Sequence, residues 1–163
     1  MPEHWLDMKK ELSGLQGQIL HTVWKADIAA LTRHLESMGF KVYIIDGSKA
    51  VNETGFFAEV AQVFNFPSYF GHGWASWDDC LGDFGFQAPQ RSAVIWAHAD
   101  QSFAEDAYTF LQAVIDIYNM AMSEQLQATR HPQADKQPKQ IELFLLGESQ
   151  GFRNTIDLIK PTK

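Results

Sequence analysis

Short runs of mostly apolar residues divide the chain and predict its strands. Three of these runs, at residues 41–46, 92–97 and 141–146, are rich in β-branched and aromatic side chains, which is typical of buried strands. A weaker alternation of apolar and polar positions over residues 18–24 predicts a further strand at the edge of a sheet.

Segments with helical spacing separate these runs. Asp27 is placed to cap a helix that ends before Gly39, and a second helix is expected from about residue 54 to residue 65. A long helix should open at Ser102, whose spacing to Glu105 matches a capping box, and continue to about residue 130. Because strands and helices alternate, the predicted fold class is α/β, with a small parallel sheet packed by helices.

Residues 67–89 interrupt this alternation. Gly71 and Gly73 predict a tight turn, and a short helix should follow from about Trp74 to Leu81. Helical spacing gives this helix a core-facing side, with Trp77, Cys80 and Leu81, and a water-facing side, with Ala75, Asp78, Asp79 and Gly82.

The composition favours a globular chain. The sequence has 163 residues, of which 45% are apolar and 13% aromatic, and it shows no internal repeat. These proportions are too rich in core-forming residues for a disordered or fibrous protein, and the length is typical of one domain.

Negative charge is concentrated in one part of the chain. The formal net charge is −7, and residues 50–90 contain five carboxylates but no lysine or arginine: Glu53, Glu59, Asp78, Asp79 and Asp83. Nucleic-acid binding requires clustered cations, so we expect no nucleic-acid partner and favour a basic protein instead. Glu53 and Glu59 are expected on a solvated helix face, which leaves the three aspartates as the candidate contact surface.

The sequence contains no sign of export or membrane insertion. Its first twelve residues mix both charge signs, and no apolar run approaches the ~18 residues of a membrane span. The single cysteine, Cys80, cannot form an internal disulfide. We therefore expect a cytoplasmic protein without a membrane partner.

Three patterns could carry catalysis or metal binding, and each lacks a component. Ser149 lies in a nucleophile-elbow pattern, but all histidines precede it, whereas that fold places the histidine after the serine. Cys80 has carboxylate neighbours that would raise its thiol pKa. His72 with Asp78 and Asp79 follows no recurring metal-ligand spacing. We expect no enzyme activity, no metal and no cofactor.

A protein-binding surface is the remaining reading of the acidic helix. Carboxylates without neighbouring cations create a negative potential that steers a basic partner. Tyr69 and Trp74 add aromatic side chains of the kind that anchor interfaces. The alternative is a solvated acidic face with no binding role.

Residues 66–81, Phe-Pro-Ser-Tyr-Phe-Gly-His-Gly-Trp-Ala-Ser-Trp-Asp-Asp-Cys-Leu, resemble the signature of barstar-like proteins. The resemblance implies a three-stranded parallel sheet packed by helices. It also implies a bacterial, intracellular immunity protein that inhibits a ribonuclease by blocking its active site. On this basis the chain is a single domain with an N-terminal strand and helix added at residues 1–40, a barstar-like core at 41–148 and a tail at 149–163.

The resemblance also assigns roles to individual positions. Tyr69 matches the family's loop tyrosine, Trp74 the first hydrophobic residue of the binding helix, and Asp79 the aspartate that occupies the enzyme's phosphate site. Gly73 and Ala75 depart from the family's Asn and Asp, so the alternative is an interaction module that keeps the fold without inhibiting. The expected partner-binding set is Tyr69, His72, Gly73, Trp74, Ala75, Asp78, Asp79 and Asp83.

Overall fold

The structure is a computed structural model that describes residues 19–103, 106–130 and 139–149. Residues 1–18 of the expected N-terminal addition and nearly all of the expected C-terminal tail therefore lie outside the described residues, as does Glu105. The described elements, in chain order, are β1 (Leu20–Trp24), α2 (Ile28–Ser37), β2 (Lys41–Asp46), α3 (Glu53–Val63), α4 (Trp74–Gln87), β3 (Arg91–Ala97), the short 3₁₀ helix η1 (Ala99–Gln101), α5 (Ala107–Arg130) and β4 (Gln140–Gly147).

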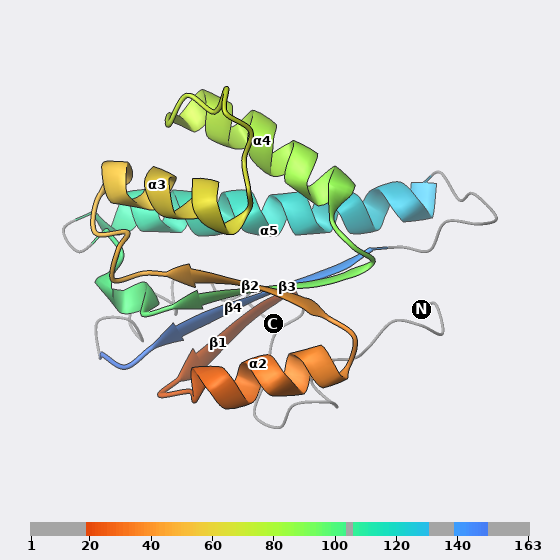
Figure 1. Ribbon diagram of the computed structural model, residues 1–163, viewed down its shortest axis with the longest axis horizontal. Coiled ribbons are helices and arrows are strands. Elements are labelled where there is room, and N and C mark those ends of the chain that lie inside the picture. Colours follow the sequence, from red (N-terminus) through yellow and green to blue (C-terminus); the bar gives the residue numbers. More distant parts are fainter. Residues whose placement is uncertain (1–18, 104–105, 131–138, 150–163) are drawn as a thin grey trace.

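The strands form one parallel sheet of four strands in the order β1-β4-β3-β2. Helices α3, α4 and α5 cover one face and α2 covers the other (Figure 1). The predicted α/β class is confirmed. The family resemblance implies three strands, and β1 adds a fourth at the edge of the sheet. It pairs with β4, so that Leu20 lies opposite Leu143.

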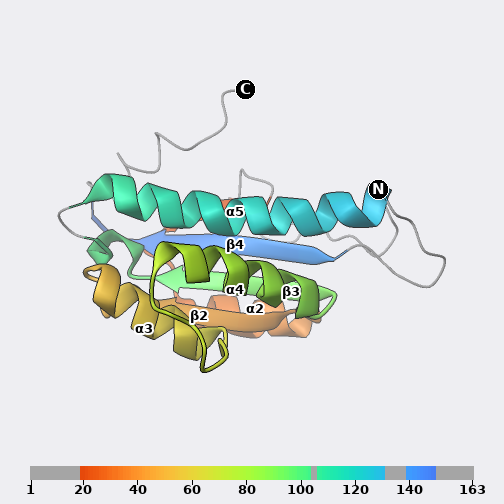
Figure 2. The same ribbon diagram turned by 90° about the horizontal axis from the view of Figure 1, so that it is seen from above.

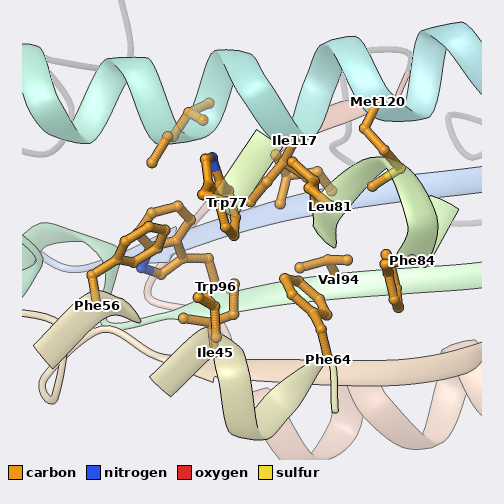
Figure 3. Close-up of a cluster of buried hydrophobic side chains, with 14 of the residues drawn as sticks. Ile45, Phe56, Phe64, Trp77, Leu81, Phe84, Val94, Trp96, Ile117 and Met120 are labelled. Carbon is orange, nitrogen blue, oxygen red and sulfur yellow. The ribbon is translucent and has the colours of Figure 1, made fainter. Parts of the chain in front are cut away.

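The main core lies between the sheet and the three helices. Phe56 of α3 stacks on Trp96 of β3, with ring centroids 5.5 Å apart and planes inclined by 12°. Trp77 of α4 is fully buried and meets Phe56 edge-on at 5.1 Å. Figure 3 shows these rings together with the aliphatic side chains of β2, β3 and α5. A smaller cluster around Leu35 and Phe144 joins α2 to the opposite face of the sheet.

Helix α4 is longer than the sequence predicted. It ends at Gln87 rather than near Leu81, because Phe84 and Gly85 continue its buried side by another turn. At Gly85 an added Cβ would lie 2.7 Å from Met120 Sδ, so the missing side chain allows close packing of α4 on α5.

The predicted capping box at Ser102 is wrong. Helix α5 begins at Ala107, and Asp106 caps it by accepting a hydrogen bond from Thr109 N at 3.1 Å. Ser102 is buried instead: its hydroxyl accepts the indole N–H of Trp96 at 2.8 Å and donates to Gly47 O. A serine with local capping spacing is thus used for a long-range contact inside the core.

The expectation for Glu59 is also wrong. Its side chain is only 8% exposed, and its carboxylate accepts the Asp46 N–H at 3.4 Å. Glu59 therefore satisfies a backbone group of the edge strand β2. Asn52 caps α3 through Gly55 N, and Asp27 caps α2 through Ala30 N as the sequence predicts.

Candidate functional site

Helix α4 presents an acidic face to solvent. Trp77, Cys80 and Leu81 are buried, whereas Ala75, Asp78 and Asp79 are exposed, which confirms the two predicted sides of this helix. Asp83 is exposed one turn further on. Because the buried side is locked into the core, the positions of these carboxylates are fixed by the fold rather than by a loop.

The charges on this face are not neutralised by the described part of the protein. Within residues 19–103, 106–130 and 139–149, Asp78, Asp79 and Asp83 form no ion pair, in contrast to Glu142 and Glu124, which do. Burial raises the pKa of the Cys80 thiol, and the charges of Asp83 and Asp79 raise it further. The thiol thus stays protonated beneath an uncompensated negative surface.

A hydrogen bond between two helices holds α4 in place. The indole Nε1 of Trp77 donates to Asp116 Oδ2 of α5 at 3.0 Å, and Gln112 donates to the other oxygen of the same carboxylate at 2.8 Å. Burial raises the pKa of Asp116 despite these two bonds, and the nearby charge of Asp78 adds to the shift. Sequence reasoning missed this role, although an aspartate interrupting the apolar side of α5 was a visible signal.

Asp116→Asn should reduce the pH dependence of stability. A raised native pKa means that the protonated carboxyl stabilises the fold below about pH 4, and that this contribution is lost as pH rises through the native pKa. An asparagine can still accept from Trp77 but does not ionise. We expect its stability relative to wild type to be more favourable at pH 7 than at pH 3.5, measured by urea denaturation. If the difference in unfolding free energy between the variant and wild type were the same at both pH values, Asp116 would not be the source of the pH dependence.

The turn before α4 does not use its glycines as predicted. The residue in the left-handed region is His72, with φ of 55°, and neither Gly71 nor Gly73 has a positive φ. Gly73 is the N-cap of α4 in extended geometry, and no side chain caps the first turn there. The backbone N–H groups in the first turn of α4 therefore lack a side-chain acceptor. An asparagine at position 73 would supply one.

Gly73→Asn should stabilise the protein by about 0.5–1 kcal/mol. An added Cβ at this position meets nothing within 4 Å, and its φ of −136° suits any residue. The gain should appear as a higher urea midpoint with an unchanged slope. Gly73→Ala is the matched control, because it also restricts the unfolded chain but cannot cap. Equal stabilisation by both variants would show that the cap contributes nothing.

The two aromatic residues of the predicted surface differ in their surroundings. Tyr69 is 72% exposed in the connection between α3 and α4. Trp74 is half-buried: its Nε1 donates to Glu53 Oε1 at 3.0 Å, and its ring meets Phe57 edge-on at 5.0 Å. Tyr69 is thus available for contact, while Trp74 also joins α4 to α3. Nothing in the local sequence links Glu53 to Trp74, which is 21 positions away.

The other chemical patterns do not form a reaction centre among the described residues. Cys80 is buried, His72 is exposed with its Nδ1 3.1 Å from Phe70 O, and the backbone N–H of Ser149 donates to Asp100. In the described ranges, no group of three or more histidine, cysteine, aspartate or glutamate side chains could hold a metal ion. None of the described helices is long and apolar enough to cross a membrane.

The fold and this site define a small parallel α/β protein with an exposed acidic helix. The family model described as Barstar (barnase inhibitor) matches residues 40–142, more than half of the chain and all of α4. The chain therefore belongs to the Barstar family, whose proteins are inhibitors rather than enzymes. A search of curated proteins found no match.

Proposed function

We propose that this protein inhibits a basic ribonuclease by covering the enzyme's active site with the acidic face of α4. Asp79 stands in for a phosphate of the RNA substrate, and Asp78 and Asp83 add to the negative potential. The observation that supports this most directly is the set of exposed carboxylates on α4, a helix whose other side is buried in the core. None of these carboxylates forms an ion pair among the described residues. Family membership supports the kind of partner.

The geometry suits tight binding because the helix is preorganised. The Trp77 bond to Asp116 ties α4 to α5, and the Trp74 bond to Glu53 ties its first turn to α3. A surface that is already ordered loses little conformational entropy when the partner docks. Tyr69 supplies exposed aromatic area and lines the same groove as Asp83. The uncompensated charge increases the rate of encounter with a basic enzyme.

A second candidate is an interaction module that binds a basic protein without inhibiting it. Gly73 and Ala75 favour it, because neither supplies a polar side chain to the exposed start of α4, where the family signature favours Asn and Asp. The partner would then contact fewer polar groups near the turn. Both candidate functions require a basic protein partner. We propose that the protein acts in the cytoplasm.

Titration of RNA cleavage tests the proposal. Purified full-length protein is added to barnase, and in parallel to other basic secreted ribonucleases, and binding is measured with the same samples. Inhibition that reaches completion near one equivalent is expected for at least one enzyme. Its association rate should fall as ionic strength rises, since the encounter is electrostatically steered. Binding without inhibition would select the second candidate, and no binding to any basic ribonuclease would overturn the proposal.

A further inference from the structure

The edge strand β2 directs half of its backbone groups away from the sheet. Asp46 lies opposite Ala97 in the register, and Gly47 N donates to Ala97 O at 2.7 Å. Alternate residues of a strand direct their N–H and C=O groups to the same side, so Tyr43 and Ile45 face β3 as Gly47 does. The backbone groups of Val42, Ile44 and Asp46 must then face outward.

Only one of these outward N–H groups is satisfied inside the described part of the chain. Asp46 N–H is accepted by Glu59, as noted above. The outward groups of Val42 and Ile44 have no hydrogen-bond partner in residues 19–103, 106–130 and 139–149. The Ile44 side chain is 39% exposed. An apolar edge with no proline or charge at its centre is a template for pairing with another strand.

A groove of about 1060 Å³ runs along this edge. One wall is β2 itself, and the opposite wall is formed by the end of α3, its connection to α4, and the side of α4. Seen from above in Figure 2, the connection between α3 and α4 reaches past β2. The lining includes the aromatic side chains Tyr43, Phe64, Phe66, Tyr69 and Phe84.

The charges of the groove specify what it would bind. Its charged lining residues are Asp83 on α4 and Lys41, whose Nζ lies 5.3 Å from the Tyr43 ring centroid. Tyr43 also meets Phe84 edge-on at 5.0 Å, beside Asp83 in sequence. Aromatic faces with a nearby carboxylate favour a basic side chain, and Lys41 favours an acidic one.

We propose that this groove binds an extended segment of a partner protein, antiparallel to β2, as a fifth strand with a basic side chain opposite Tyr43. In that register the segment's neighbouring residues pair with Val42 and Ile44 and form four backbone hydrogen bonds. The residue opposite Tyr43 points to the same face as Tyr43, toward the groove. A second copy of β2 would place tyrosine opposite tyrosine and leave Asp83 without a cation. The groove shares Asp83 and Tyr69 with the proposed inhibitory surface, but Asp79 is not among its lining residues.

A short peptide provides the test. Acetyl-Thr-Val-Arg-Val-Glu-amide places arginine opposite Tyr43, its valines opposite Ile44 and Val42, and glutamate opposite Lys41. Titrated into ¹⁵N-labelled full-length protein, it should shift the Val42 and Ile44 amide signals to saturation. The same peptide with both valines N-methylated keeps every side chain but lacks the two donors, and should bind at least about tenfold more weakly.

Two variants of α4 test whether the peptide is held by the groove rather than by the exposed carboxylate of Asp79. Asp83→Asn should weaken peptide binding about tenfold, because the charge-assisted contact with arginine is lost. Asp79→Asn, the matched control on the same helix, should leave peptide binding unchanged. The proposal is overturned by equal binding of the N-methylated peptide or by the absence of shifts at Val42 and Ile44. Shifts of these amides with protein concentration alone would assign the edge to a second copy.

Discussion

Asp79→Ala should weaken the complex with the target ribonuclease by about 2–5 kcal/mol, a loss of roughly 30- to 5,000-fold in affinity. The carboxylate is exposed in the free protein, but it would be buried against cations of the enzyme in the complex. Removing it leaves those cations desolvated and unpaired, which costs more than the contact itself contributes. The loss should appear chiefly in the dissociation rate, measured by surface plasmon resonance or stopped-flow displacement.

Glu36→Ala is the control for this change. Glu36 is an exposed carboxylate near the end of α2, on the opposite face of the sheet, so its removal changes the net charge equally. The affinity of the Glu36→Ala variant for the ribonuclease should remain within about twofold of wild type, because charges further apart than a Debye length are screened. Equal losses for both variants would mean that net charge alone drives binding, and an unchanged affinity for Asp79→Ala would remove its proposed role.

Trp77→Ala should lower the free energy of unfolding by about 3–5 kcal/mol. The Trp77 side chain extends from α4 and is fully buried against α3 and α5. Its removal leaves a large cavity beside Phe56. It also removes the donor that Asp116 accepts. Urea denaturation followed by circular dichroism measures the loss, which should appear as a lower midpoint.

Phe86→Ala on the same helix is the matched comparison. Phe86 is 68% exposed, so its truncation should change stability by no more than about 0.5 kcal/mol. Trp77→Phe separates the two contributions of Trp77, because it fills most of the cavity but cannot donate to Asp116. A loss below 1 kcal/mol for Trp77→Ala would mean that the helix repacks, and that the core does not fix the position of the acidic face.

The strands could be predicted because their burial is continuous. Residues 41–46 match β2 at both ends, and the other two buried runs match β3 and β4 within one residue. The two sides of α4 were predicted for the same reason, since helical spacing alone determines which positions share a face. Its length was not, because Gly82 and Gly85 have low helix propensity, and the last turns depend on the burial of Phe84 and the packing of Gly85 on Met120.

The remaining differences arise from contacts between residues far apart in the sequence. Ser102 and Glu59 look like ordinary surface positions locally, yet one bonds Trp96 and Gly47 and the other bonds the β2 edge. The position of His72 in the left-handed region also follows from the path of the turn rather than from its glycines. For the same reason, the groove beside β2 could not be predicted, since its lining residues come from three stretches of the chain, within residues 41–44, 63–69 and 80–89.

The pairing of β1 with β4 has a consequence for the order of folding. It joins Leu20 to Leu143, so this pair can form only after nearly the whole described chain has been synthesised, and closing so long a loop is entropically slow. Helix α4 packs on α5 and the main core. We therefore expect β1 to add late and to detach first, in a partial opening that leaves the acidic helix folded.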